Sequence, residues 1–171
     1  MENKIMSGGI SALAIVLALS CATATAGPSR SETEIRQLIS RWDAAFRARD
    51  LDGVMSVYAP GTEFVGFDIS PPLQYSGREA YRESYRIFFA QYDGPLTVEY
   101  RDVKIESGGT IGLYHALERL TGTLKSGERS SVWVRVTCGL RRVDGAWRII
   151  HDHLSVPVDF NTGKALLDLT P

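Results

Sequence analysis

The chain has 171 residues, of which 44% are hydrophobic and 23% charged, and its formal net charge at pH 7 is −1. This size and composition are typical of a single globular domain. Because acidic and basic residues are balanced and interspersed, the sequence offers no basic face for nucleic acid or for an anionic membrane.

The first 26 residues have the features of a secretory signal peptide. Residues 10–19 form an apolar run that is too short to cross a bilayer as a helix, and Ala24-Thr25-Ala26 supplies a small-x-small cleavage pattern. We therefore expect a chain that is exported, periplasmic or secreted, and that has no membrane contact after cleavage. The remaining residues, 27–171, are expected to form one domain.

A lipid anchor through Cys21 is the alternative to a cleaved, soluble form. A lipoprotein signal has a large aliphatic residue three positions before the cysteine, whereas this chain has Ala18 there. The sequence therefore favours cleavage. Cleavage leaves Cys138 as the only cysteine, so no internal disulfide is expected.

Apolar residues at three- and four-residue steps predict two helices at the start of the domain. The first runs from Ser31 to about Arg49, and the second extends from its N-cap Asp50 through Tyr58 to the stop at Pro60-Gly61. A short strand follows over residues 62–68 and ends at a proline-containing loop.

A third helix is predicted after Ser76-Gly77-Arg78-Glu79, which fits a capping box, and it ends at Asp93-Gly94-Pro95. Its apolar stripe is mainly aromatic and contains Tyr81, Tyr85 and Phe89. Such a stripe is more often part of a core than the wall of a ligand cavity, and both uses stay open here.

The second half predicts four strands joined by short turns, which makes neighbouring strands antiparallel. Their approximate ranges are 96–106, 110–124, 129–143 and 146–158. The first of them should lie at a sheet edge. The expected fold class is α+β, with a curved, cone-shaped antiparallel sheet wrapped around three helices from the N-terminal half. The open end of such a cone is a natural pocket.

Two stretches carry a resemblance to a known superfamily. Residues 41–59, RWDAAFRARDLDGVMSVYA, resemble the first two helices of ketosteroid isomerase-type proteins. Residues 135–157, RVTCGLRRVDGAWRIIHDHLSVP, resemble the last hairpin of SnoaL-like proteins and of the calcium/calmodulin-dependent kinase association domain. The chain is thus similar to the nuclear transport factor 2-like superfamily, which implies a cone-shaped α+β fold and a SnoaL-like domain. The superfamily contains enzymes, ligand binders and assembly modules.

The resemblance does not carry over ketosteroid isomerisation. The position of its dienolate-stabilising tyrosine holds Trp42, and the position of its general-base aspartate holds Gly66. Asp68 lies two residues further on the same strand face and is a candidate substitute. The arginine that follows the second histidine in the kinase association domain is replaced by Leu154.

The turn at Asp144-Gly145 sets the predicted register of the last hairpin, because it pairs Val143 with Ala146. Counting outward pairs Cys138 with His151, Thr137 with Asp152 and Arg135 with Leu154. Arg135 and Asp152 then share one face of the sheet, which we assign to the cavity. A three-residue turn with a bulge would instead place Arg135 opposite His153.

Asp152 is the predicted catalytic base, and Arg135 or Trp42 would stabilise a developing oxyanion. The alternative is an Arg135–Asp152 ion pair that is purely structural. His153 is the second candidate for catalysis. The His151-x-His153 pair could also bind a metal with a third ligand such as Cys138 or His115, but partly buried, hydrogen-bonded imidazoles are the favoured interpretation, so no metal site is predicted.

These observations predict an exported SnoaL-like domain, homodimeric, that binds a small, mainly apolar molecule and catalyses acid/base chemistry without a cofactor, such as isomerisation, dehydration or cyclisation. The alternative is a ligand-binding or oligomeric assembly module without turnover. The predicted ligand-binding residues are Trp42, Phe64, Asp68, Tyr81, Tyr85, Trp133 and Thr137.

Overall fold

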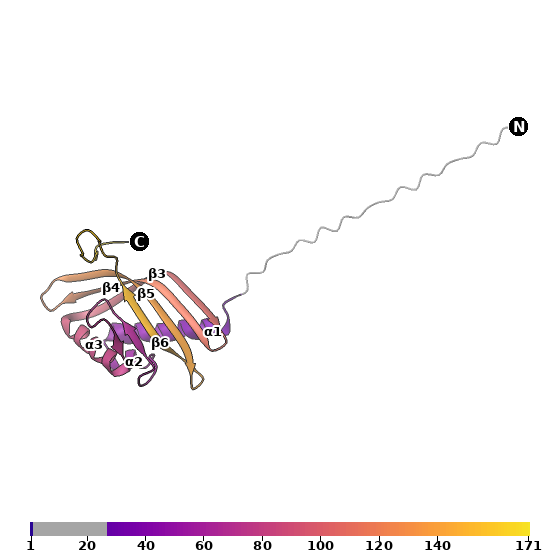
Figure 1. The fold of residues 1–171 in the computed structure, drawn as a ribbon, viewed down its shortest axis with the longest axis horizontal. Helices are drawn as coiled ribbons and strands as arrows, with labels where there is room; N and C mark the ends of the chain where they lie inside the picture. Colours follow the sequence, from indigo (N-terminus) through magenta and orange to yellow (C-terminus); the bar gives the residue numbers. More distant parts are fainter. Residues whose placement is uncertain (2–26) are drawn as a thin grey trace.

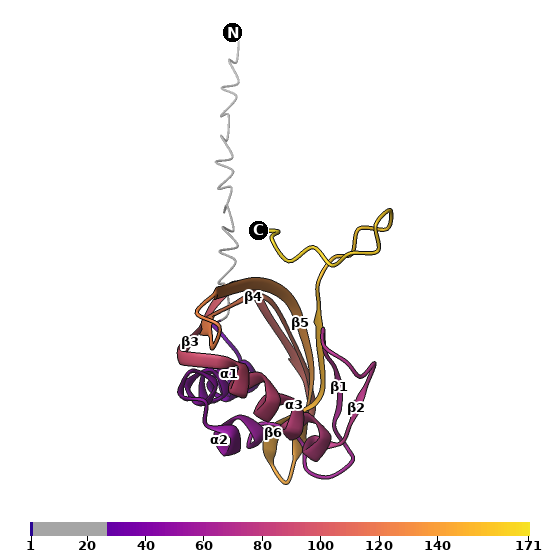
Figure 2. The ribbon, with the colours of Figure 1, turned by 90° about the vertical axis from the view of Figure 1, so that its left-hand side faces the viewer.

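The computed structural model describes Met1 and residues 27–171. Three helices pack against the concave side of one curved sheet of six strands (Figures 1 and 2). The predicted α+β class and the wrapping of the sheet around the helices are confirmed. The predicted signal peptide, with Cys21, lies outside the described residues. None of the helices in the described part of the chain is long and apolar enough to span a membrane.

The first two helices form as predicted, and the first is capped by a residue that the sequence analysis did not name. Helix α1 spans Arg30–Ala48, and the Ser29 side chain accepts a hydrogen bond from the Glu32 backbone N–H at 3.1 Å. Helix α2 spans Leu51–Met55 and is capped by Asp50. It ends earlier than predicted, because the Val57 carbonyl accepts a hydrogen bond at 2.9 Å from Ile149 N in the sheet.

Helix α3 spans Arg78–Gln91, but it does not begin with the predicted capping box. Its N-cap is Gly77, which has φ 87° and makes no side-chain capping hydrogen bond. Ser76 is part of strand β2, Tyr75–Ser76, and pairs with Val65. Pairing with a strand thus holds Ser76 away from the helix start, and only glycine readily adopts the positive φ that redirects the chain there.

The sheet has the order β2-β1-β6-β5-β4-β3, so β3 lies at an edge as predicted. The last four strands form the expected antiparallel meander. Strand β1 is shorter than predicted. The bounds of the remaining strands are Val65–Phe67 for β1, Tyr92–Gly108 for β3, Ile111–Leu124 for β4, Arg129–Val143 for β5 and Ala146–Ser155 for β6.

Strand β1 runs parallel to β6, a pairing that the sequence did not indicate. Val65 pairs with His151, Gly66 with Asp152, and Phe67 with His153. The pairing extends the sheet beyond β6 and carries the segment that follows β1, including Asp68, to the same end of the sheet as Asp152.

The predicted register of the β5–β6 hairpin is correct only near its turn. Asp144 and Gly145 both have positive φ, and Val143 pairs with Ala146 as predicted. A bulge then shifts the register between Leu140 and Gly139, and from there Cys138 pairs with Asp152 rather than with His151. The predicted pairs beyond the bulge are wrong, and so is the alternative register with Arg135 opposite His153, because Arg135 pairs with Ser155.

Helix α1 approaches the sheet closely at Gly112 of β4. A Cβ atom at this position would lie 2.8 Å from Ile35 Cδ1 and 3.3 Å from Trp147 Cζ3. Ile35 and Trp147 are buried in the core. The absence of a side chain at Gly112 therefore sets the distance between α1 and the sheet.

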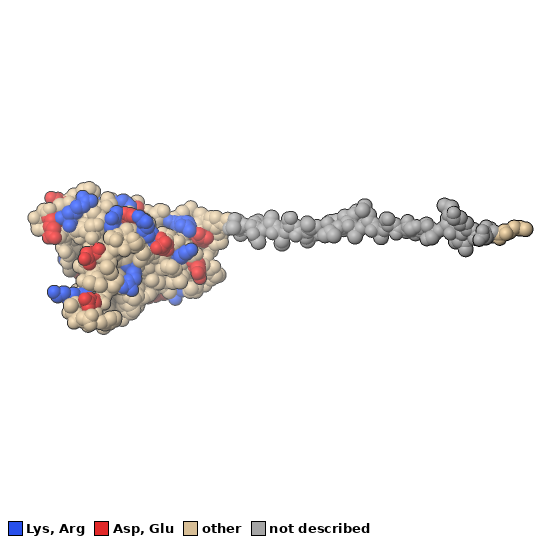
Figure 3. Space-filling model, turned by 90° about the horizontal axis from the view of Figure 1, so that it is seen from above, with Lys and Arg blue, Asp and Glu red and all other residues tan. Residues whose placement is uncertain are grey.

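Basic and acidic side chains alternate over the face of the molecule seen in Figure 3. Acidic and basic side chains also pair within helices, as in the Arg36–Glu32 and Arg47–Asp43 bridges of α1. Exposed pairs of this kind contribute little to stability, about 0.3–0.5 kcal/mol each.

Candidate functional site

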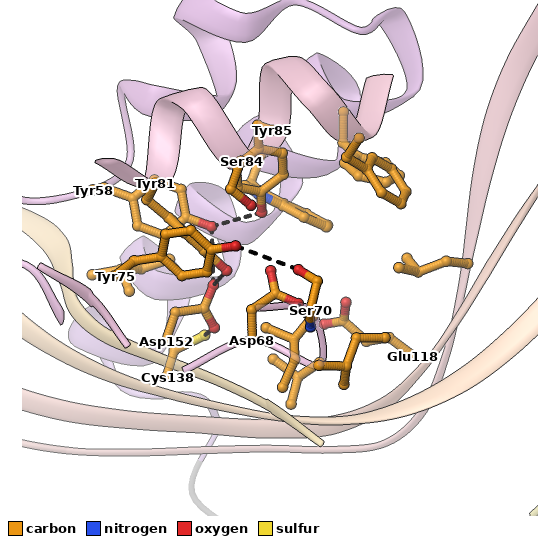
Figure 4. A pocket seen from close by; sticks show the side chains of 18 of the residues that line it. Tyr58, Asp68, Ser70, Tyr75, Tyr81, Ser84, Tyr85, Glu118, Cys138 and Asp152 are labelled. Carbon is orange, nitrogen blue, oxygen red and sulfur yellow. Dashed lines mark hydrogen bonds between the residues drawn. The ribbon is translucent and has the colours of Figure 1, made fainter. Parts of the chain in front are cut away.

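A cavity of about 550 Å³ lies between the helices and the concave face of the sheet (Figure 4). Its volume is in the range of pockets that bind small molecules. Exposed residues such as Ile69 and Ile87 mark its opening, between the β1–β2 loop and α3. The polar and charged side chains in its wall are Asp68, Ser70, Ser84, Gln91, Glu118, Cys138 and Asp152, together with the hydroxyls of Tyr58, Tyr75, Tyr81, Tyr85 and Tyr114.

Asp152 is buried in the cavity wall, with only 3% of its surface exposed. Tyr58 and Tyr81 each donate their hydroxyl to Asp152 Oδ2 at 3.1 Å, and the Cys138 thiol donates to Oδ1 at 3.4 Å. Tyr58 and Tyr81 come from the helical half of the chain, and Cys138 comes from β5. The carboxyl group of Asp152 thus connects the helical side of the cavity to the sheet by hydrogen bonds.

The donors form a directed chain that ends at Asp152. Because Tyr58 gives its only hydroxyl proton to Asp152, the 2.9 Å contact between the hydroxyls of Tyr85 and Tyr58 must have Tyr85 as its donor. The Trp42 indole N–H in turn donates to the Tyr85 hydroxyl at 3.2 Å. The series Trp42, Tyr85, Tyr58, Asp152 therefore directs each hydrogen bond toward the carboxylate.

Burial raises the pKa of Asp152 above its usual value, and the hydrogen bonds from Cys138, Tyr58 and Tyr81 partly offset this increase. Burial also raises the pKa of Tyr58 and of Tyr81 well above their usual range, so both phenols remain hydrogen-bond donors at neutral pH. Burial thus favours the neutral form of Asp152, and its three hydrogen bonds favour the ionised form.

Asp68 lines the same cavity beyond the end of β1. Its Oδ1 accepts a hydrogen bond from the Ser70 backbone N–H at 3.3 Å, and burial raises its pKa. Gly66, two residues earlier, lies close against two aromatic rings. A Cβ atom there would lie 3.1 Å from Phe64 Cζ and 3.2 Å from Tyr81 Cε2.

Glu118 on β4 is a third carboxyl group in the cavity wall, and the sequence analysis missed it. Tyr114 donates to Glu118 Oε1 at 2.8 Å, and burial, the largest cause, raises the pKa of Glu118 to about 7. The available signal was alternation, since Tyr114, Ala116 and Glu118 share one strand face. The opposite face, with Leu113 and Leu117, is equally apolar, so the alternation alone did not identify the inner side.

Of the predicted site residues, Trp42, Asp68, Tyr81, Tyr85 and Asp152 lie in the cavity wall. Phe64 lies behind the wall and packs edge-on against Tyr58, with ring centroids 4.9 Å apart. Cavity residues that the sequence analysis did not single out as site residues include Tyr58, Tyr75, Tyr114, Glu118 and Cys138.

The predicted Arg135–Asp152 pair is wrong. The bulge in β6 reverses the face of every residue that follows it, so Asp152 points inward beside Cys138 while Arg135 is exposed on the outer face of β5. Thr137 and Trp133 lie on that outer face as well. Trp133 packs there under the guanidinium of Arg119, 5.4 Å from the ring centroid.

The two histidines also lie on the outer side of the sheet. His153 is exposed, and the His151 ring nitrogen Nδ1 hydrogen-bonds the Val65 carbonyl at 2.9 Å. Phe67 packs edge-on against His151, with ring centroids 4.8 Å apart. His153 therefore cannot act on a molecule in the cavity. In residues 27–171, no three side chains of His, Cys, Asp or Glu are grouped so that they could hold a metal ion.

Comparison with known proteins agrees with this architecture. Residues 35–159 match the SnoaL-like domain family. The chain belongs to the SnoaL-like family of the nuclear transport factor 2-like superfamily. The predicted resemblance is thereby confirmed. No curated protein matches this SnoaL-like chain.

Several solved structures share the SnoaL-like fold. A nuclear transport factor 2-like protein of unknown function from Pseudomonas putida is 37% identical, with a TM-score of 0.75, over 85% of this chain and 100% of that one. A proposed calcium/calmodulin dependent protein kinase II association domain from Xanthomonas campestris is 21% identical, with a TM-score of 0.66, over 85% and 95% of the chains. A proposed dehydratase from Streptomyces avermitilis is 17% identical, with a TM-score of 0.66, over 75% and 97%. The last two similarities concern the fold alone.

Proposed function

We propose that this SnoaL-like domain binds a small, mainly apolar molecule in the cavity and that Asp152 transfers a proton to or from it, without a cofactor. The observation that carries the proposal is a buried carboxyl group in the wall of an open cavity of about 550 Å³. Burial raises the pKa of this carboxyl group above its usual value, and a carboxyl group of raised pKa is suited to act as a general base and then as a general acid. Isomerisation, dehydration and cyclisation are reactions of this kind.

Two effects act in opposite directions on the protonation of Asp152. The hydroxyls of Tyr58 and Tyr81 stabilise the carboxylate by hydrogen bonding, while burial favours the neutral acid. The oxyanion role predicted for Arg135 is withdrawn, because Arg135 lies outside the cavity. The Trp42 indole N–H is already donated to Tyr85, so it does not replace Arg135. Neither of the two predicted oxyanion stabilisers is therefore free to act in the cavity.

A binding module without turnover is the second candidate function. It is favoured by the three donors that surround Asp152, since a carboxylate with this many hydrogen bonds is also a common structural element. Superfamily members include assembly modules, and such a module would retain the cavity as part of its core.

Replacing Asp152 with Asn tests the proposal on a substrate found by screening small apolar alcohols, ketones and amines. We expect Asp152→Asn to lower kcat by about 100-fold or more while the dissociation constant changes by less than about fivefold, because loss of a general base removes only the proton-transfer step. Arg135→Gln, on the outer face, is the control and should retain wild-type kcat. Equal kcat in Asp152→Asn and the wild type would eliminate Asp152 as the base, and saturable binding without turnover would favour the binding module.

We also propose that the domain is a homodimer and that the chain is exported with residues 1–26 removed. The outer sheet face supports the dimer, because it exposes Ile111 and Leu113 of β4 by 53% and 40%. The mass of the mature N-terminus, measured on protein recovered from outside the cytoplasm, distinguishes cleavage before Gly27 from a lipid anchor on Cys21.

A further inference from the structure

The cavity wall is acidic and contains no basic residue. Of the residues that line it, Asp68, Glu118 and Asp152 carry carboxyl groups, and none is a lysine, arginine or histidine. Burial is the largest cause that raises the pKa of Asp152 and of Glu118, and repulsion adds to it, from Asp68 on Asp152 and from Asp152 and Asp43 on Glu118. The carboxyl groups of the cavity wall therefore have no counter-ion in the wall itself. An anionic ligand would add to the electrostatic repulsion between them.

The rest of the wall is rich in aromatic rings, which favour cations. Eight aromatic side chains line the cavity, namely Trp42, Phe46, Tyr58, Tyr75, Tyr81, Tyr85, Phe88 and Tyr114. The face of an aromatic ring carries partial negative charge, so it attracts an ammonium group that has lost part of its hydration shell. The combination of rings and carboxylates is the usual environment of a bound organic cation.

Glu118 has a free acceptor within this wall. Its side chain is buried, with 5% exposed, and Tyr114 donates to Oε1. Oε2 accepts no hydrogen bond from the part of the chain that the structure describes, and it is not one of the fully buried polar atoms there, so it is open to the cavity. An N–H group of a ligand in the cavity would donate to this oxygen in a charge-assisted hydrogen bond.

The charges of the groups near Glu118 also favour a cationic ligand. Asp152 from β6 and Asp43 from α1 are acidic, and both raise the pKa of Glu118. Tyr114 on β4, Tyr100 on β3 and Cys138 on β5 are neutral groups near it. The described side chains that influence Glu118 therefore include no cation. A metal ion is a poor substitute, because the described carboxyl groups do not cluster as metal ligands do.

We propose that the ligand of this cavity is an apolar organic amine in its ammonium form, with its hydrocarbon part against the aromatic rings and its N–H groups donated to Glu118. This inference deepens the proposed function by naming the substrate class, and it rests on the cavity being the binding site. A positively charged ligand would also stabilise the ionised form of Asp152, the form that accepts a proton.

The test compares three molecules with the same naphthalene ring system: 2-(1-naphthyl)ethylamine, 2-(1-naphthyl)ethanol and 1-naphthylacetate. Isothermal titration calorimetry on the wild-type protein at pH 8 measures each dissociation constant. We expect the amine to bind at least tenfold more tightly than the alcohol, and the acetate at least tenfold more weakly than the alcohol.

Glu118→Gln, which keeps the size of the side chain and its acceptor for Tyr114, should weaken amine binding at least fivefold and leave alcohol binding within twofold. Glu83→Gln is the matched control, because Glu83 is an exposed residue of α3 that pairs with Arg86, and it should change neither constant. If the alcohol binds as tightly as the amine, the amine proposal is wrong and the apolar-ligand proposal stands. If none of the three binds, both are wrong.

Discussion

Glu118 is a buried acid that destabilises the fold when it ionises. Its pKa is about 7 in the folded protein, above its ordinary value of 4.5. Between these pH values the folded protein binds more protons than the unfolded chain does, so the free energy of unfolding falls as the pH rises from about 4.5 to about 7. Above pH 7 the free energy of unfolding stops falling. The total decrease due to Glu118 is at most about 3 kcal/mol.

Glu118→Gln should remove this pH dependence, because the amide does not ionise. We predict that the variant unfolds with a free energy about 2–3 kcal/mol higher than the wild type at pH 8, and that the difference is small at pH 4.5. Urea unfolding followed by circular dichroism at the two pH values measures it. Glu128→Gln, in the exposed turn between β4 and β5, is the control. A variant less stable than the wild type at pH 8 would contradict the assignment.

At the residue level, sequence reasoning identified Asp152 as a cavity residue but gave it the wrong partner. Period-two alternation assigns faces reliably only when no residue is inserted, and the sequence Ile149-Ile150 gives no sign of the bulge. The tyrosines that do contact Asp152 lie 94 and 71 positions earlier in the chain. Contacts over such separations depend on how α2 and α3 pack, which no local pattern encodes.

The helices and strands whose positions depend on short stretches of sequence, such as caps and turns, were predicted well. The period-3.6 stripe predicts α1, the Asp50 cap predicts the start of α2, and the Asp144-Gly145 turn predicts the β5–β6 hairpin. The parallel pairing of β1 with β6 was not predicted, because it joins segments that lie 86 positions apart in the chain. The capping box at Ser76 failed because Ser76 pairs with Val65 of β1 instead.

The close approach of α1 to β4 gives a prediction at the level of elements. Gly112→Ala would place a methyl group 2.8 Å from Ile35 Cδ1, so the helix or the side chain must move. We expect a loss of about 1–3 kcal/mol in the free energy of unfolding, the usual cost of overpacking. Urea unfolding measures it. Gly108→Ala is the control, because a Cβ atom there has no neighbour within 4 Å. Equal midpoints for the two variants would show that the contact is easily relieved.

For the whole molecule, the order of elements was sufficient to predict the fold. Helices followed by a meander of long strands leave few arrangements other than a sheet curved around the helices, and the superfamily match confirms it. The interior of the cavity was harder to predict. Its lining comes from α1, α3, the β1–β2 loop and the strands β2, β4, β5 and β6, so its charge depends on the face that each element turns inward.

At the level of the whole molecule, the proposed homodimer should form through the outer face of the sheet. We predict that Leu113→Lys raises the dimer dissociation constant at least tenfold, because a charge would have to be buried at an apolar contact. Sedimentation equilibrium at micromolar concentration measures the mass. Leu73→Lys, in the exposed β1–β2 loop, is the matched control and should remain dimeric. Wild-type protein that sediments as a monomer would contradict the proposal.

The crowding at Gly66 has a consequence for where this cavity can hold an acid. In the isomerase-type proteins that this chain resembles, the corresponding position holds the acid, but here a Cβ atom at residue 66 would lie 3.1 Å from Phe64 Cζ and 3.2 Å from Tyr81 Cε2. Tyr81 is one of the three donors to Asp152. A side chain at position 66 would therefore displace a ring that also positions the buried carboxyl group, so an acid placed there would disturb the hydrogen bonds of Asp152.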